Sequence, residues 1–182
     1  MPRKPRAVYL YAVLLLLLSA AITAAHVLRG ELRPPTLSAA VLMAVFVALT
    51  AAAGAFALPI SPRTKVVVDT SLIFAAGLLF PPPWAGAIAA LGIGIRLMLV
   101  RPQFLDLLIN ISVGFLETTA LQFVFSFLGG TFPAHFTEAF VALPLLGAGL
   151  AFLALDRLLI YTAVALYQGL KLRQIIFSNW AR

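Results

Sequence analysis

The chain has 182 residues, of which 63% are hydrophobic and 10% are charged, and its mean hydropathy is +1.06. A soluble domain carries about 45–50% apolar and about 25% charged residues, so this composition excludes a disordered chain and an ordinary cytosolic enzyme. The chain has no cysteine and two histidines. These counts exclude a disulfide scaffold, thiolate catalysis and a Cys- or His-rich metal centre. The composition predicts an integral membrane protein.

The net charge of +7 comes from 13 Lys and Arg residues against 6 Asp and Glu residues. The basic residues lie mainly between apolar runs rather than in one patch, which argues against nucleic-acid binding. In membrane proteins an excess of Lys and Arg usually marks the cytoplasmic loops. We therefore expect the lipid bilayer to be a partner of this chain, and expect no nucleic-acid partner.

A helix needs about 20 apolar residues to cross a hydrocarbon core of about 30 Å. The sequence contains six apolar runs, at residues 8–27, 37–58, 66–80, 85–100, 105–128 and 139–167. Basic residues before the first run, its Leu-rich core and the small residues Ser19–Ala21 follow in the order of a signal peptide and its cleavage site. That run is longer than the hydrophobic region of a usual signal peptide, so we interpret it as a retained helix. The sixth run is long enough to tilt, or to bend at Pro144.

The runs at 66–80 and 85–100 are short, and three prolines and Trp84 separate them. Either these helices cross a thinned or protein-lined region, or they form a re-entrant hairpin. Both alternatives give the same distribution of charge, whereas Trp84 beside prolines suits a membrane interface. The sequence therefore predicts an all-α integral membrane protein with six transmembrane helices, the third and fourth of them short.

With six crossings, most basic residues fall on one side of the membrane. That side holds Arg3, Lys4, Arg6, Arg63, Lys65, Arg101, Lys171, Arg173 and Arg182, and the loops on the other side hold Arg29 and Arg33. The positive-inside rule then places both termini in the cytoplasm. We divide the chain into a polytopic domain, 1–168, and a basic juxtamembrane segment, 169–182, which is amphipathic enough to lie on the membrane surface.

Charged residues inside the predicted crossings are the most informative feature of the sequence. They are Asp69, Arg96, Asp106, Glu117, Asp156 and Arg157. Each costs at least about 2.5–3.5 kcal/mol at the bilayer centre, so each should face protein or water and be paired. Glu117, Asp156 and Arg157 lie deepest in their runs.

Helical spacing places these charges on two polar faces. Asp106, Asn110 and Glu117 share one face of the fifth helix, and Arg157, Tyr161 and Gln168 share one face of the sixth. The simplest assembly pairs Glu117 or Asp106 with Arg157, with Asp69 and Arg96 forming a second contact. Two interpretations stay open: a salt-bridge network that fixes helix packing, or a polar pocket that binds a ligand.

Small residues mark places where transmembrane helices approach closely. On the first helix, Ala20, Ala21, Ala24 and Ala25 form two Ala-x-x-x-Ala ladders. Similar ladders of alanine and glycine lie on the second and fourth runs. Ordinary packing within the chain explains such ladders, but the first helix is the best candidate for docking a protein partner or a second copy.

The residues around the third and fourth runs resemble a known type of membrane module. Ser71–Ala75 is of the type Ser-x-x-Phe-Ala, and Ala85–Gly92 is an Ala-rich helix ending in Leu-Gly. This pattern, after the Leu-Pro segment at Leu58, is similar to the N-terminal sensor-type membrane modules of bacterial HD-GYP phosphodiesterases and GGDEF diguanylate cyclases. Gly169–Trp180 resembles the basic link before their output. The resemblance implies an input module in a bacterial inner membrane, and the chain contains no HD-GYP or GGDEF domain.

The six short helices with alanine ladders on the first also resemble the substrate-binding components of energy-coupling-factor vitamin transporters. In that family an Ala-x-x-x-Ala face docks a transmembrane partner, and the ladders at Ala20/Ala24 and Ala21/Ala25 match it. This resemblance implies a cavity open to the outside, which we expect to be lined by Trp84, Phe132 or Phe136.

No motif for a catalytic triad, a zinc protease, a phosphate loop or a dinucleotide site occurs in the sequence. We expect no catalytic residue, metal site or cofactor, although an intramembrane acid–base enzyme using Glu117 or Asp156 is an alternative. The leading hypothesis is a non-catalytic membrane module that binds a small-molecule ligand within the bundle and couples to a partner or output domain. The alternatives are a transport component and a structural subunit of a larger complex.

Overall fold

The computed structural model describes residues 5–31, 34–55, 58–61, 64–66, 69–99, 103–134 and 141–180. Its elements in chain order are α1 (Arg6–Leu28), α2 (Leu37–Ala55), β1 (Leu58–Ser61), β2 (Thr64–Val66), α3 (Asp69–Leu79), α4 (Trp84–Leu99), α5 (Phe104–Phe127), α6 (Ala142–Gln168) and α7 (Leu172–Trp180). Four of these helices, α1, α2, α5 and α6, are long and apolar enough to cross a membrane. The predicted helical membrane class is confirmed, and the chain is a multi-pass membrane protein.

The connection between α2 and α3 differs from the prediction, because a two-stranded antiparallel hairpin replaces the ends of two predicted helices. β1 pairs with β2, with Leu58 opposite Val66. Pro59 lacks an N–H and disfavours a helical conformation in the residue before it, so α2 ends at Ala55 instead of continuing to Leu58. Helix α3 begins only at Asp69, whose carboxylate suits the positive end of a helix dipole.

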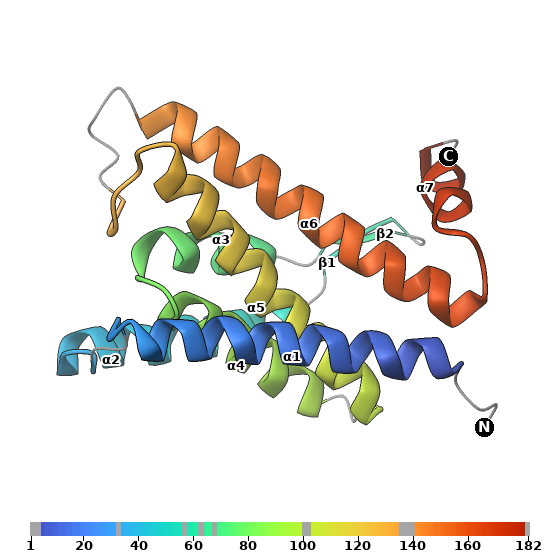
Figure 1. Cartoon of the computed structure of the whole chain (residues 1–182), viewed down its shortest axis with the longest axis horizontal. Coiled ribbons are helices and arrows are strands. Elements are labelled where there is room, and N and C mark those ends of the chain that lie inside the picture. Colours follow the sequence, from blue (N-terminus) through green and yellow to red (C-terminus); the bar gives the residue numbers. More distant parts are fainter. Residues whose placement is uncertain are drawn as a thin grey trace.

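Helix α5 is the centre of the bundle. It packs against α1, α3, α4 and α6, and eleven of its 24 residues are buried, whereas α2 has two buried residues out of 19. In Figure 1, α5 runs between α6 and α1, and α6 forms the upper edge of the bundle. The apolar side chains of α1, α2 and α6 remain largely exposed, which is the pattern expected of helices that face lipid.

Helix α4 packs closely between α2 and α5 because two of its glycines leave room for large neighbours. A Cβ atom at Gly86 would lie 2.7 Å from the Phe115 ring, and one at Gly92 would lie 2.7 Å from Thr50 Cβ. Both distances are shorter than any van der Waals contact. Small residues at membrane helix interfaces allow such close approach. The van der Waals contacts that then form between the helices stabilise their packing.

The short helix α3 ends inside the protein, where two other segments bind its last carbonyl groups. The buried Gln122 side chain of α5 donates through Nε2 to the carbonyl oxygens of Gly77 (3.1 Å) and Phe80 (2.7 Å). The Ala134 N–H donates to the Leu78 carbonyl oxygen at 3.0 Å. With 11 residues, α3 is about 16 Å long, too short to cross about 30 Å of hydrocarbon alone. Its carbonyl groups therefore need these protein donors.

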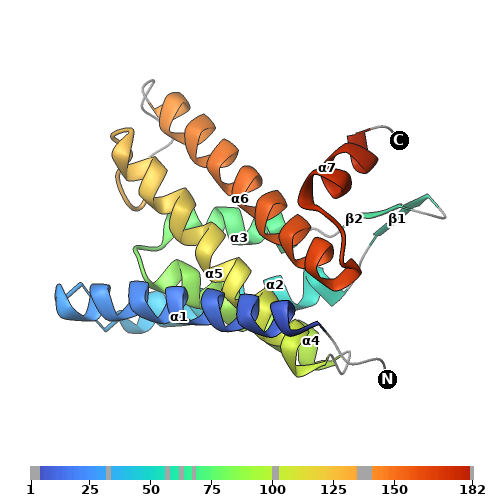
Figure 2. The same ribbon diagram turned by 45° about the vertical axis from the view of Figure 1, so that its right-hand side comes forward.

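The chain segments gather at two ends of the bundle. The start of α1, the β1–β2 hairpin, the end of α6 and helix α7 lie at the same end in Figures 1 and 2. Helix α6 ends at Gly169, whose φ of 66° is left-handed, and α7 then packs back against α6. Of the basic residues that the predicted topology uses, Arg3, Lys4, Arg33, Arg63, Arg101 and Arg182 lie outside the described residues.

Helix α6 needs no bend at Pro144. The helix begins at Ala142, so Pro144 lies in its first turn, where backbone N–H groups have no partner within the helix. The missing N–H of proline therefore leaves no intrahelical hydrogen bond unmade.

Replacing Gln122 with leucine should destabilise the protein. Gln122→Leu keeps a side chain of similar size but leaves two buried carbonyl groups without their side-chain donor. Such a loss costs about 1–3 kcal/mol of stability. We expect a lower unfolding temperature of the detergent-solubilised protein. Gln168→Leu, at an exposed position, is the matched control and should change it little. An unchanged unfolding temperature for Gln122→Leu would contradict this role.

Candidate functional site

Two carboxyl groups face each other near the middle of the two longest helices. Glu117 comes from α5 and Asp156 from α6, and their side chains lie within hydrogen-bonding reach. Glu117 is 5% exposed and the Asp156 side chain is 18% exposed. Asp69 of α3 is a third acid within electrostatic range of both. Within the described part of the chain, Glu117 forms no ion pair with a lysine or arginine.

The predicted pairing of Arg157 with Glu117 or Asp106 is wrong. The Arg157 side chain is 63% exposed, and its Nε lies 3.7 Å from Oδ2 of the adjacent Asp156. The two residues are neighbours in sequence and so point about 100° apart on α6. Asp156 turns toward α5 and Arg157 turns away from it. The polar faces of α5 and α6 therefore bring two acids together rather than an acid and a base.

The predicted contact between Asp69 and Arg96 is confirmed. Arg96 Nη1 of α4 donates to Asp69 Oδ2 at the start of α3, and the two groups form an ion pair. The Asp69 side chain is 8% exposed and the Arg96 side chain is 19% exposed. Gly54 of α2 makes room for this pair, since a Cβ atom there would overlap the Arg96 side chain. The pair joins α3 to α4 against α2.

The acidic residue near the start of α5 binds a tyrosine that the sequence analysis did not select. The Tyr167 hydroxyl of α6 donates to Asp106 Oδ1, and Asn110 Nδ2 donates to the Asp106 carbonyl oxygen at 2.7 Å. Helical spacing predicts Tyr161, not Tyr167, on the polar face of α6. Tyr161 is only half-buried. This hydrogen bond ties the last turn of α6 to the first turn of α5.

A cavity of about 340 Å³ opens between α3 and α6. Its lining residues are Thr70, Ser71 and Phe74 of α3 and Gly149, Phe152 and Leu153 of α6. The Phe74 and Phe152 rings contact edge to face, with centroids 5.7 Å apart. Two lining residues lie near acids in the sequence, since Thr70 follows Asp69 directly and Leu153 lies one helical turn before Asp156. The lining itself offers two hydroxyl-bearing side chains and two aromatic rings.

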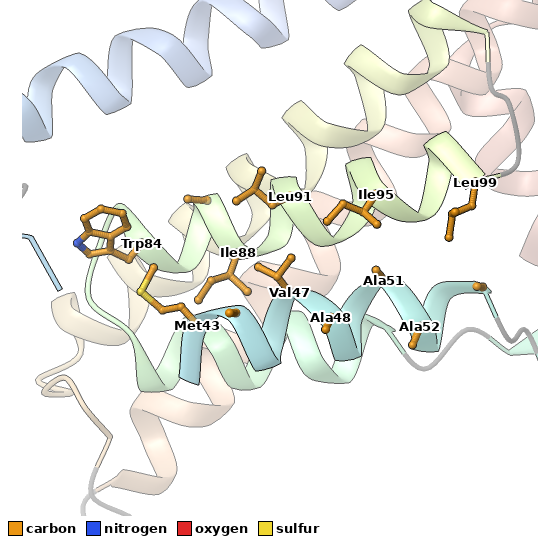
Figure 3. Close-up of a pocket in the computed structure, with 13 residues that line it drawn as sticks. Met43, Val47, Ala48, Ala51, Ala52, Trp84, Ile88, Leu91, Ile95 and Leu99 are labelled. Atoms are coloured by element: carbon orange, nitrogen blue, oxygen red, sulfur yellow. The ribbon is translucent and has the colours of Figure 1, made fainter. Parts of the chain in front are cut away.

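A larger cavity, of about 820 Å³, is an apolar groove between α2 and α4. Figure 3 shows Met43, Val47, Ala48, Ala51 and Ala52 of α2 facing Trp84, Ile88, Leu91, Ile95 and Leu99 of α4 across it. The groove carries no charged side chain among its lining residues. It can accept lipid chains or an apolar helix, but it has no group that selects a polar ligand.

The residues predicted for partner docking or transport lie in several places. Ala20, Ala21, Ala24 and Ala25 are exposed on α1, so no part of the described chain covers them. Trp84 lines the groove between α2 and α4, whereas Phe132 packs against Phe125 with ring centroids 5.2 Å apart. Phe136 lies outside the described residues. Trp84 and Phe132 therefore do not line one common cavity.

Sequence reasoning missed three residues that organise the polar interior: Gln122, Tyr167 and Gly54. Gln122 and Tyr167 carried a signal, because each is a polar side chain within an otherwise apolar run. Their partners are 42 to 61 residues away, and helical spacing alone does not identify contacts between helices. Across the described ranges, no group of three or more His, Asp or Glu side chains is arranged to hold a metal ion.

Comparison with known proteins gives no further assignment: no family model, no curated protein and no solved structure matches the chain. The resemblance to sensor-type membrane modules therefore stays a prediction.

Removing one member of the Asp69–Arg96 pair should be more harmful than removing both. Arg96→Leu leaves a buried carboxylate without its partner, and breaking a buried pair in this way costs about 3–5 kcal/mol. The double variant Asp69→Leu/Arg96→Leu removes both charges, so we expect it to regain much of the lost stability. Unfolding temperatures in detergent measure the stability of each variant. If the single and double variants lose the same number of degrees, this prediction is wrong.

Proposed function

We propose that this chain is a non-catalytic membrane module that binds a small, positively charged molecule at Glu117 and Asp156 and couples that binding to its C-terminal end. One observation carries the proposal. Glu117 is more than nine-tenths buried in the middle of the bundle, and it faces another carboxyl group rather than a base.

A purely structural network is expected to pair its charges. The Asp69–Arg96 contact does so, which shows that this bundle can supply a buried acid with a cation. At Glu117 and Asp156 the second acid instead raises the electrostatic energy whenever both groups are ionised. A cation between them removes that repulsion. Ionisable residues inside membrane proteins usually mark such binding sites and pathways.

The surroundings favour an organic ammonium ion as the ligand. The neighbouring cavity presents the Thr70 and Ser71 hydroxyl groups and the edge-to-face pair of Phe74 and Phe152. An ammonium group is attracted to carboxylates and to the faces of aromatic rings, and hydroxyl oxygens accept its hydrogen bonds. A volume of about 340 Å³ suits a small molecule.

The site is connected to the C-terminal end through α6. Asp156 lies on this helix, and the same helix ends at Gly169 before α7, which packs against it. The hydrogen bond from Tyr167 to Asp106 ties the end of α6 to α5. A change in spacing between α5 and α6 at the acid pair would therefore reach the α6–α7 corner. We propose that a partner or output domain senses this corner.

The proposed location is a bacterial inner membrane, with both termini in the cytoplasm and six crossings. The described residues at the end that contains the start of α1 and helix α7 include Arg6, Lys171 and Arg173, whereas Arg29 lies at the opposite end. This distribution follows the positive-inside rule.

A transport component is the second candidate, and a structural subunit of a larger complex is the third. The exposed alanines of α1 favour docking to a membrane partner, as the resemblance to vitamin transporters implies. A transport component would use the same ligand site. A structural subunit would need only the exposed apolar faces and no ligand.

Methylammonium is the probe that tests the ligand site. Methylammonium replaces sodium at constant ionic strength. We expect the unfolding temperature of the detergent-solubilised protein to rise with the methylammonium concentration. Saturation at 100 times the dissociation constant adds about 2.7 kcal/mol of stability. Glu117→Gln should abolish this dependence and, without ligand, should be at least as stable as the parent, because it removes the repulsion. Glu31→Gln is the control and should keep the dependence. Two results together would identify a structural role for Glu117: Glu117→Gln is less stable than the parent, and the parent does not respond to methylammonium.

The absence of cysteine makes labelling a clean test of topology. We expect an impermeant maleimide to label Glu31→Cys and Pro81→Cys from outside intact cells. Arg173→Cys should react only after permeabilisation. Labelling of Pro81→Cys from neither side would instead favour a re-entrant α3–α4 hairpin. Labelling of Arg173→Cys from outside would contradict the proposed orientation.

A further inference from the structure

One face of α6 carries a continuous stripe of exposed side chains at alternating spacings of three and four residues. The α6 stripe consists of Leu143, Leu146, Leu150, Leu153, Arg157 and Ile160, with exposed fractions of 65%, 63%, 61%, 50%, 63% (side chain) and 38%. This spacing gives the 3.5-residue period by which one helix packs along another. A second helix can therefore pack along the stripe.

The rest of the described chain leaves this stripe uncovered. The buried residues in the first half of α6 are Pro144, Ala148 and Phe152, which lie on the opposite side of the helix from the stripe. That buried side packs against α5, and α6 lies at the edge of the bundle in both views (Figures 1 and 2).

Arg157 distinguishes this stripe from a surface that merely faces lipid. It lies 11 residues before the end of α6 at Gln168, which is about 16 Å along the helix axis. Its flanking stripe residues are Leu153 and Ile160. Its Nε–Oδ2 distance to Asp156 of 3.7 Å exceeds hydrogen-bond length, and a guanidinium group has five N–H donors. Facing lipid, such a charge is costly.

We propose that the α6 stripe binds a transmembrane helix of a different protein, and that this helix carries one carboxylate at the level of Arg157. An arginine fork and a carboxylate form two parallel hydrogen bonds, which would satisfy two of the five guanidinium donors. The leucines on either side supply the apolar contact. Leu153 also lines the cavity between α3 and α6, but the charge contact is separate from the acid pair because Arg157 points away from Glu117.

A second copy of this chain does not meet the same requirement. Two copies have the same orientation in a membrane, so α6 helices packed along their stripes would run parallel. Parallel packing with this period places each stripe residue beside its own copy, and Arg157 would then face Arg157. The acids within the described helices, Asp69, Asp106, Glu117 and Asp156, are all buried or half-buried. A copy therefore offers no exposed carboxylate at this depth.

Synthetic transmembrane peptides test the proposal directly. The protein carries a donor fluorophore at Arg173→Cys and is reconstituted into phosphatidylcholine vesicles with acceptor-labelled leucine-rich peptides of about 20 residues. The peptides differ only at one central position, which is Glu, Gln, Lys or Leu. We expect the Glu peptide to associate about tenfold more strongly than the Leu peptide.

Charge exchange supplies the matched variants. Arg157→Leu should lose the preference for the Glu peptide, and Arg157→Glu should prefer the Lys peptide instead. Arg29→Leu, which removes the arginine at the end of α1, should behave like the parent. Because each variant is compared across four peptides, a general loss of folding would lower all four associations equally and is thereby distinguished from lost charge recognition.

Two results would overturn the proposal. The first is equal association of the Glu and Leu peptides with the parent, which would mean that Arg157 extends to lipid headgroups. The second is energy transfer between two labelled copies of this chain. If Leu150→Ala abolishes this transfer and Arg157→Glu preserves it, a second copy occupies the α6 stripe.

Discussion

The hydrocarbon of a membrane offers no hydrogen bonds, so each polar group at that depth must find its partner within protein. The Asp69–Arg96 ion pair is the clearest consequence in this bundle. It joins the start of α3 to the last turns of α4, and it lies against Gly54 of α2. The pair thus connects three helices in a region where an unpaired charge of either sign would be costly. The same constraint explains why Gln122 of α5 donates to the buried carbonyl groups at the other end of α3. Together these contacts hold α3, a helix too short to span a membrane by itself, within the bundle.

Two sets of charges do not follow this pattern, and they define the parts of the molecule that need something from outside the chain. Glu117 and Asp156 face each other in the interior, where each raises the electrostatic energy of the other when both are ionised. Arg157 faces outward beside leucines and lacks a carboxylate of suitable geometry. These two sets of charges have opposite sign and lie on different sides of α6. We propose a small cation as the ligand of the inner set and an acidic membrane helix as the partner of the outer one. In this proposal helix α6 connects the ligand site, the partner surface and the C-terminal helix.

The helices themselves were predictable because apolar length is a local property of the chain. The described bounds of α1, α4 and α5 differ from the predicted runs by one or two residues. The errors fell where proline chemistry acts: Pro59 ends α2 early and leaves room for a hairpin, and Pro144 lies in a first turn where it disturbs nothing. The two short central helices were also expected, but the donors that bind the end of α3 come from residues far along the chain. Sequence spacing gives no information about such contacts.

The sequence by itself determined that this is a helical membrane protein, that it lacks thiol chemistry, and that its buried charges are the residues of interest. These follow from composition and from the periods of single helices. Only the tertiary structure decided which charges meet. Helical periodicity placed Asp106, Asn110 and Glu117 on one face, yet Asp106 binds Tyr167 while Glu117 faces Asp156. The physical reason is that pairing depends on the rotation and relative height of two helices. Close packing of glycines against bulky side chains, as at Gly86 against Phe115, constrains that geometry, and no single helix contains that information.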